Sequence, residues 1–357
     1  MAILKLYRKK LKENYLFLDK LFRKHGIEWG VVSKLLCGNK LFIKELYDLG
    51  IRELHDTRIS NLKVLKQTAP DIQTVYIKPV PKKSIASIIK YADVSFNTSL
   101  STIKLLSKEA KRQDKLHKII IMVEMGDLRE GVMGEQLVEF YKNVFRLPNI
   151  EIIGLGTNFN CLNGIMPSVD KLVQLCLYKQ LIEVKFDRKI QWVSGGTTVA
   201  IPMLLKKQIP KGVNHFRVGE ALFFGKDLFT GGVIKNMNKD VFRLYAEVIE
   251  LYEKPVVPTG QQMKNPSGKI PEFNEADFGK KTYRAIIDVG LLECNPRFLF
   301  PEDASIKHIE ASSDMLVLDL GRNENNYKVG DMLCFQLNYM GVLGVMNSNY
   351  VIKEVEA

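Results

Sequence analysis

The sequence lacks long apolar runs, closely spaced cysteines and clustered histidines. No stretch approaches the roughly 18–20 apolar residues that a membrane-spanning helix needs, so we expect no membrane partner. The five cysteines are scattered, which favours reduced thiols in a cytoplasmic protein over disulfides or a structural zinc site. The five histidines are scattered as well, and we predict no metal site. Residues 1–12 are basic without an apolar core, and we expect them to belong to the mature protein.

The net charge of +12 is spread unevenly over 357 residues, of which 46% are hydrophobic. Residues 231–357 contain 14 Lys and Arg against 18 Asp and Glu, whereas residues 1–230 contain 38 against 22. A basic surface of this kind attracts nucleic acid or an anionic cofactor, or is only a solvated face. No motif that combines aromatic and basic residues accompanies it, so we predict no nucleic-acid partner. The opposite charges of the two parts also permit head-to-tail pairing of two chains.

Short β-branched runs alternate with amphipathic segments through the first 230 residues, after a polar helical segment at residues 6–25. The runs predict eight strands, at residues 30–35, 53–56, 74–77, 94–97, 119–124, 152–156, 190–193 and 216–219. Eight strands separated by helical segments are typical of a (β/α)8 TIM-like barrel, and the predicted fold class is therefore α/β. An open doubly wound sheet is the alternative, although such a sheet more often has fewer strands and one glycine-rich phosphate turn.

The pattern changes after residue 225. Residues 241–253 alternate like a strand, and residues 255–277 are rich in Pro, Gly and Asn and predict a long loop. Further short strands are predicted at residues 283–289, 315–320 and 332–337. We therefore expect a barrel over residues 1–230, followed by a small C-terminal all-β domain over residues 231–357.

Polar residues at the ends of the predicted strands are the first candidates for catalysis, because barrel enzymes place their active sites there. Lys34 follows the first run and is placed to face the barrel mouth as an imine-forming nucleophile. A lysine that only extends along the surface is the alternative. Arg129 lies just past the fifth run, between two glycines, and is placed to bind a carboxylate through both arms of its fork. An ordinary loop arginine is the alternative.

Two later segments have the composition of a phosphate site. The segment from Ser194 to Thr198 follows the seventh run and is expected to form a turn that opens a helix. Its backbone N–H groups and the hydroxyls of Thr197 and Thr198 suit a phosphate, although a plain helix cap is the alternative. Arg217 lies at the end of the eighth run, where barrel enzymes often bind phosphate. It is placed to reach the ring of a cofactor whose phosphate lies at Gly219 and Glu220. A salt-bridged arginine at a strand end is the alternative.

Taken in order along the chain, these segments resemble the fold-type III pyridoxal-phosphate enzymes, the alanine racemase group, and within it the ornithine racemase-like branch. The resemblance covers essentially the whole chain. The segments that carry it are Gly30-Val-Val-Ser-Lys34, Cys37-Gly-Asn39, Gly126-Asp-Leu-Arg-Glu-Gly131, Gly156-Thr-Asn158, Ser194-Gly-Gly196, Arg217-Val-Gly-Glu-Ala-Leu-Phe-Phe-Gly225 and Asn338-Tyr339.

The resemblance implies a role for each matching residue. Lys34 matches the lysine that binds pyridoxal 5'-phosphate covalently, and Arg129 matches an arginine near the cofactor oxygen and the substrate carboxylate. The other matches are Thr198 on the phosphate, Arg217 facing the pyridine nitrogen, Gly219 and Glu220 as backbone phosphate donors, Tyr339 near the phosphate and the entrance, and Ser313 with Asp314 reaching the site of a partner subunit. An arginine stays protonated, so a ring nitrogen that faces it stays mostly unprotonated, which favours simple proton transfer with Lys34 acting on one face.

The sequence also departs from alanine racemase. Val289 stands where that enzyme's second base, a tyrosine from the partner, is expected. We select Glu293 as the replacement base, with Asp288, Cys294 and Tyr339 as alternatives. Two further replacements are Asn158 for a histidine that packs on the cofactor ring and Met122 for a lysine that supports the central arginine. These changes argue against a standard alanine racemase and leave room for another substrate.

The function predicted is racemisation of ornithine, another basic amino acid, a broad range of amino acids or alanine, by a homodimer whose β domain completes the partner's site. A basic substrate needs carboxylates nearby, and the candidates are Glu124, Asp127, Glu130 and Glu293. One alternative is a non-catalytic pyridoxal-phosphate homeostasis protein, but such proteins resemble the barrel alone. Another is a metal-dependent lyase or aldolase on D-amino acids, for which His308 and Cys294 have unconvincing spacing.

Overall fold

The computed structural model describes residues 1–264, 268 and 270–357. It divides into two compact units, of which Tyr7–Val241 form the first, and Met1–Leu6 with Phe242–Glu356 form the second. The division falls between residues 241 and 242, whereas the sequence analysis expected a boundary after residue 230. The first six residues also belong to the C-terminal unit, which the sequence pattern did not indicate.

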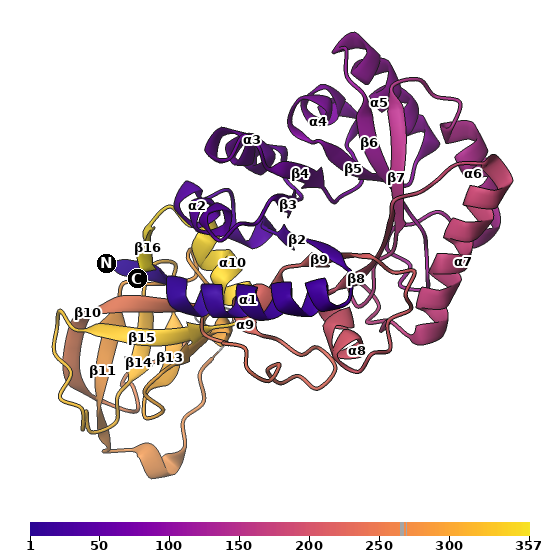
Figure 1. Cartoon of the computed structure of the whole chain (residues 1–357). Coiled ribbons are helices and arrows are strands. Elements are labelled where there is room, and N and C mark those ends of the chain that lie inside the picture. Colours follow the sequence, from indigo (N-terminus) through magenta and orange to yellow (C-terminus); the bar gives the residue numbers. More distant parts are fainter. Residues whose placement is uncertain (265–267, 269) are drawn as a thin grey trace. The chain divides into compact units, whose positions relative to one another are not determined.

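Within the described residues, eight parallel strands close into a barrel in the order β2 to β9 (Figure 1). They are β2 (Glu28–Val32), β3 (Glu53–Asp56), β4 (Gln73–Tyr76), β5 (Val94–Asn97), β6 (His117–Met122), β7 (Ile150–Gly156), β8 (Trp192–Thr197) and β9 (His215–Val218). The last strand, β9, pairs with β2 as well as with β8. The predicted α/β barrel is thus confirmed, and the open sheet is excluded.

Buried side chains from successive strands pack against one another in the barrel. Alternate residues of a strand share one face, and Phe96 with Val94 and Met122 with Ile120 follow this spacing. The cluster also includes Val75, Ile153 and Trp192. Fully burying one such apolar side chain contributes about 1.5–3 kcal/mol relative to leaving it in water, so this cluster holds neighbouring strands in register.

One helix precedes the first barrel strand, a helix follows each barrel strand, and the helices lie on the outer side of the strands (Figure 1). They are α1 (Arg8–Lys24), α2 (Lys40–Asp48), α3 (Ile59–Thr68), α4 (Ile85–Tyr91), α5 (Leu100–Arg112), α6 (Leu137–Val144), α7 (Val169–Phe186), α8 (Ile201–Leu205) and α9 (Glu220–Phe224). In α5, for example, Ile103, Leu106 and Ala110 are buried at the spacing of one helical face. Over the part of the chain that the structure describes, no helix is both long and apolar enough to traverse a bilayer.

The second unit is a mostly antiparallel β structure, as the sequence predicted. Its strands are β1 (Ala2–Tyr7), β10 (Phe242–Pro255), β11 (Lys281–Ile287), β12 (Leu299–Pro301), β13 (Lys307–Ala311), β14 (Leu316–Asp319), β15 (Met332–Leu337) and β16 (Val351–Glu356). The order is β12-β15-β10-β11-β14-β13, and β1 pairs with both β10 and β16. A nine-residue helix, α10 (Tyr339–Asn347), follows β15 and was not predicted.

Three local predictions are wrong in their bounds. Helix α1 begins only at Arg8, because residues 2–6 pair with β10 instead. The first barrel strand ends at Val32, and Lys34 opens a short 3-10 turn. Strand β8 continues to Thr197, so residues 194–197 are not a turn. The reason is packing, because a Cβ on Gly196 would lie 2.3 Å from the Phe216 ring.

Candidate active site

Barrel closure brings the carboxyl ends of the first and last barrel strands together. In the β2–β9 pair, Gly30 lies opposite Arg217 and Val31 opposite Val218. Beyond the paired residues, β2 leads into Lys34 and β9 leads into Glu220, the first residue of α9. Burial raises the pKa of Glu220, and the nearby charges of Lys226 and Lys34 oppose this rise. The Lys34 side chain is exposed, and it shares this rim with Glu220.

The turns after β8 and β9 form a polar cradle next to Lys34. Thr198 is buried, and its hydroxyl oxygen accepts a hydrogen bond from the Ala221 N–H at 3.1 Å, so its own proton remains available to a ligand. A Cβ on Gly219 would lie 3.2 Å from the Cβ of Val32, so the backbone at Gly219 packs closely against Val32. Thr197 pairs with Arg217 at the end of β8. Small residues, hydroxyls and exposed backbone at one rim suit a phosphate group.

Arg217 is buried in the barrel, and burial lowers its pKa to about 10. Its Nη1 donates to the carbonyl oxygen of Ser194 at 2.8 Å and to the Ser194 hydroxyl at 2.5 Å. Its Nη2 donates to the carbonyl oxygen of Thr157 at 2.7 Å and to Oδ1 of Asn158 at 2.8 Å. Four of its five N–H groups are thus bound by acceptors, and among the described residues no acceptor binds the fifth, on Nε. That free donor fits the unprotonated nitrogen of a pyridine ring.

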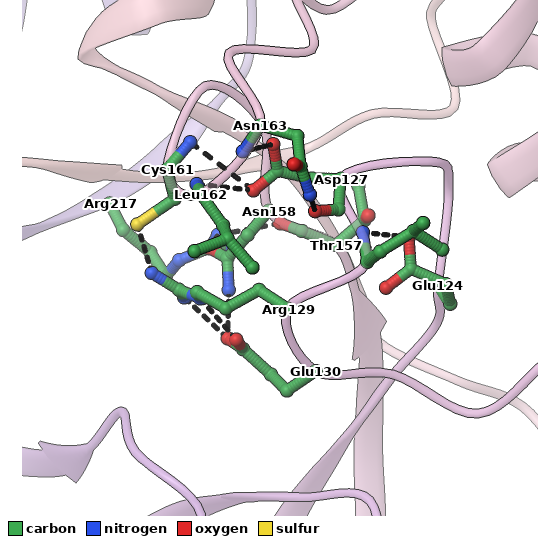
Figure 2. Close-up of polar contacts among 11 residues, drawn as sticks. Glu124, Asp127, Arg129, Glu130, Thr157, Asn158, Cys161, Leu162, Asn163 and Arg217 are labelled. Carbon is green, nitrogen blue, oxygen red and sulfur yellow. Dashed lines mark hydrogen bonds and ion pairs between the residues drawn. The ribbon is translucent and has the colours of Figure 1, made fainter.

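Arg129 lies in a second polar network that reaches Arg217 through Asn158 (Figure 2). Both arms of Arg129 bind Glu130, and its Nη1 also contacts the sulfur of Cys161. The Glu130 hydrogen bond raises the pKa of Arg129. The side chain of Asn158 also donates to Glu130. The predicted fork of Arg129 onto a carboxylate is therefore present, but its acceptor in the free protein is the adjacent glutamate.

Asp127 and Glu124 hold the backbone of the loops around this network (Figure 2). Asp127 accepts hydrogen bonds from the backbone N–H groups of Leu162 at 2.9 Å and Asn163 at 3.1 Å, and from two further amides in residues 160–165. Glu124 accepts from the N–H groups of Gly126 at 2.6 Å and Leu128 at 2.9 Å. Glu124 is thus engaged by its own loop and Asp127 by the loop after β7, which the sequence pattern alone did not indicate.

The structure also brings together a buried group that the sequence analysis missed. Glu53 and His55 lie on β3 and His215 lies on β9, and their ligand atoms all lie within 4.8 Å of one another. One carboxylate oxygen of Glu53 lies 2.6 Å from Nε2 of His55 and 2.8 Å from Nε2 of His215. The histidines are far apart in the sequence, and only the order of the barrel strands brings them to one place.

The remaining predicted residues belong to the C-terminal unit. Glu293 is buried, and its carboxylate accepts a hydrogen bond from the Gly290 N–H at 2.8 Å. Tyr339 is half-buried as the first residue of α10, which Asn338 caps by accepting from the Gly341 N–H at 3.0 Å. Ser313 and Asp314 are exposed. The structure places each of these residues relative to the rest of the C-terminal unit.

We expect Asp127→Asn to loosen the loop at residues 160–165. Although burial opposes ionisation, the backbone hydrogen bonds hold the pKa of Asp127 below its usual value. Its stabilising contribution is therefore complete above the unfolded aspartate pKa of about 3.9 and is lost as the pH falls through the lower folded value. At neutral pH the variant's Leu162 and Asn163 amides should exchange hydrogen roughly 10- to 100-fold faster, because hydrogen bonds to a charged group are worth about 1.5–3 kcal/mol.

The matched control for that measurement is Asp114→Asn, at an exposed position outside this loop. It should leave the exchange of both amides unchanged. Equal exchange rates in Asp127→Asn and the wild-type protein would show that Asp127 does not hold the loop.

Comparison with known proteins places this geometry in a family. The model of the alanine racemase N-terminal domain matches residues 7–227. The chain is 35% identical to an ornithine racemase of Acetoanaerobium sticklandii over 347 residues, 97% of each chain. It is 32% identical to a lysine racemase of Thermotoga maritima over 348 residues, which cover 98% of this chain and 96% of the relative.

The fold is also similar to solved structures. One is an alanine racemase from Bartonella henselae with covalently bound pyridoxal phosphate, which is similar at a TM-score of 0.72 and 16% identity over 99% of both chains. At this level of identity the likeness concerns the fold. The family match and the two relatives cover most of the chain, and the chain therefore belongs to the alanine racemase family.

Proposed function

We propose that this protein is a pyridoxal-phosphate-dependent racemase of basic amino acids. The observation that carries the proposal is the rim formed by Lys34, Thr198, Gly219 and Glu220, with the free N–H of Arg217 beside it. The two relatives named ornithine racemase and lysine racemase, which the chain matches over nearly its whole length, support a basic substrate.

The residues of the rim fit each part of the cofactor. The hydroxyls of Thr197 and Thr198 and the backbone at Gly219 and Glu220 bind the phosphate. The side-chain amine of Lys34, which lies at the same rim, would hold the aldehyde carbon covalently, with release of water. Nε–H of Arg217 donates to the ring nitrogen and, as a lasting cation, keeps a proton off it. When bound, the cofactor draws electrons away from the Cα–H bond of the attached amino acid.

Racemisation requires a proton to leave one face of Cα and to return on the other. Lys34 would take or return the proton on the face that it occupies whenever its amine is not bound to the cofactor. Glu293 of a partner subunit serves the opposite face. Its side chain is buried, and its contact with the Gly290 N–H fixes one of its oxygens. Arg129 holds the substrate carboxylate in place of Glu130.

A basic side chain of the substrate needs a carboxylate near the rim. Glu124 and Asp127 already bind backbone N–H groups of nearby loops and are poor candidates. Glu130 and Glu293 remain. When the substrate carboxylate takes over Arg129, Glu130 is released and is free to bind a side-chain ammonium group. We assign the preference for ornithine or lysine to this exchange of partners.

We further propose that the active form is a cytoplasmic homodimer in which residues 231–357 complete the partner's site. None of the five cysteines, all of which lie in the described residues, forms a disulfide, and this suits a reducing compartment. The surplus of acidic residues in this part and of basic residues in the barrel favours mutual attraction of two copies. Sedimentation should therefore give a dimer at the concentrations used for assays. A monomer with full activity would contradict this arrangement.

The variant Lys34→Ala tests the cofactor site. The wild-type protein should bind pyridoxal phosphate with the visible absorption band of a lysine-bound aldehyde, and Lys34→Ala should lose that band and nearly all racemase activity, because the variant lacks the amine that holds the aldehyde. Lys40→Ala, which removes an exposed lysine from the start of α2, is the control and should keep both. An unchanged band in Lys34→Ala would refute the assignment of Lys34.

Exchange of the Cα hydrogen with deuterated solvent tests the reaction and the substrate. Each enantiomer of ornithine, lysine and alanine is incubated with the enzyme, and deuterium incorporation and optical inversion are measured together. We expect exchange with inversion, fastest for the two basic amino acids. Exchange with retention alone would indicate a cofactor-binding protein without a second base, and cleavage to smaller products would indicate a lyase.

In the same assay, Glu293→Gln should suppress exchange from one enantiomer at least roughly tenfold more than from the other, because a missing base affects only one face. An equal loss for both enantiomers would remove Glu293 from this role.

A further inference from the structure

The buried group around Glu53 is joined to Arg217 by an unbroken line of hydrogen bonds. Nη1 of Arg217 lies 2.5 Å from the Ser194 hydroxyl oxygen, and that oxygen lies 2.6 Å from Nδ1 of His215. On the other side of the imidazole, Nε2 of His215 lies 2.8 Å from Oε1 of Glu53. Ser194, His215 and Arg217 are all buried. The line runs from the first residue of β3 to the residue that faces the rim.

With a neutral His215, donor and acceptor chemistry sets the direction of every bond in this line. A guanidinium group only donates, and an ionised carboxylate only accepts. The Ser194 oxygen therefore accepts from Arg217, and its single proton goes to Nδ1 of His215. Nδ1 is then unprotonated, and Nε2–H of His215 donates to Glu53. One neutral tautomer of His215 satisfies all three contacts, with a positive charge at one end and a negative charge at the other.

Glu53 is held in its charged form. Burial alone would raise its pKa, but the hydrogen bonds from His215 and His55 oppose this, and the pKa of Glu53 lies well below its usual range. Its second oxygen accepts a hydrogen bond from Nε2 of Gln73 at 2.8 Å. Burial lowers the pKa of His55, which is therefore a neutral donor.

Close packing around this line fixes its side chains and leaves no room for larger residues beside them. Trp192 stacks on His215 with ring centroids 4.3 Å apart and planes 13° from parallel, which fixes the plane of the imidazole. A Cβ on Gly30 would lie 2.3 Å from Nε2 of His55 and 2.4 Å from Oε1 of Glu53. Only glycine at position 30 leaves room for the carboxylate, so the glycine that opens the segment leading to Lys34 is required by the buried group.

A metal ion is the competing explanation for Glu53, His55 and His215. An ion held by nitrogen and oxygen ligands at about 2.0–2.1 Å keeps those ligands apart from one another. Here the oxygen and the two nitrogens are at 2.6 and 2.8 Å, the distances at which they share protons. The contacts favour hydrogen bonds over metal ligation.

We propose that Ser194, His215 and Glu53 are positioning residues that hold Arg217 with its Nε–H aimed at the ring nitrogen of the cofactor. The inference rests on the proposed function, in which Arg217 faces that nitrogen. The negative charge of Glu53 compensates the buried positive charge of Arg217 from a distance, through the neutral side chains of His215 and Ser194. Direct contact with a carboxylate would instead turn the guanidinium group away from the cofactor, because both arms of the fork would bind it.

The test compares Ser194→Ala and Glu53→Gln with Ser95→Ala. Ser95 is a matched control, since its hydroxyl oxygen lies 2.7 Å from Nε2 of the buried His117 in the same barrel, outside the line to Arg217. Each purified holoenzyme is loaded with pyridoxal phosphate labelled with 15N in the ring. The ring 15N chemical shift is recorded, and kcat and KM are measured for ornithine.

Ser194→Ala and Glu53→Gln should shift the ring 15N resonance and lower kcat roughly 10- to 100-fold, as loss of an outer hydrogen-bond partner does elsewhere, with KM changed by less than about threefold. Ser95→Ala should leave the resonance in place. If Ser194→Ala and Glu53→Gln both leave the ring 15N resonance unchanged and keep kcat within about twofold of wild type, the proposal is overturned. This holds even if the protein is a racemase.

Imidazole 15N spectra of the wild-type holoenzyme test the line without any substitution. His215 should be neutral with its proton on Nε2. A doubly protonated His215, a proton on Nδ1, or a stoichiometric metal ion in the purified protein would overturn the proposal even if the variants fail to fold. A wild-type protein that binds no pyridoxal phosphate would contradict the proposed function as well, which separates the two failures.

Discussion

The pairing of β2 with β9 is the constraint on which the rest of the structure depends. These strands stand at opposite ends of the barrel sequence, and their register places Gly30 beside Arg217. That one alignment brings Lys34 to the same rim as Glu220 and brings His55 into the barrel beside His215. A shift of one residue would turn alternate side chains to the other face of the strand and would separate both groups.

The positive charge of Arg217 is buried without a direct carboxylate partner among the described residues. Arg217 binds two backbone carbonyl oxygens, a hydroxyl and an amide oxygen, and its carbon Cζ lies 5.2 Å from the centre of the Phe96 ring. Charged groups stand one or two hydrogen bonds further away, Glu130 beyond Asn158 and Glu53 beyond Ser194 and His215. This arrangement leaves one N–H group free for a ligand, which a direct ion pair would not.

Much of the fold and part of the site follow from local sequence pattern. Strand and helix periodicity predicts the barrel, and polar residues such as Lys34 and Arg217 stand out because they follow apolar runs. The pairing of β1 with β10 was not predictable in this way, since its partner is more than 200 residues along the chain. The buried group of Glu53, His55 and His215 was missed for the same reason, because its members meet only through barrel closure.

The use of the carboxylates was not predictable either. Glu124, Asp127 and Glu130 lie in one short segment and look alike in sequence, yet two bind backbone amides and the third binds Arg129. Their difference depends on the directions of backbone N–H groups in residues 126–128 and 160–165. At residues 194–197 the local pattern was misleading instead. The two glycines suggested a turn, but they lie in strand β8, where close packing of Gly196 against Phe216 requires a residue without a side chain.

The most direct measurement of the central claim is chemical fixation of the cofactor followed by peptide mapping. Borohydride converts the bond between the lysine and the cofactor into a stable amine, and mass spectrometry of the digested protein then locates it. If barrel closure builds the site at the ends of β2 and β9, the label will lie on Lys34 alone. A label on another lysine, or none on a protein that retains the cofactor, would contradict the account.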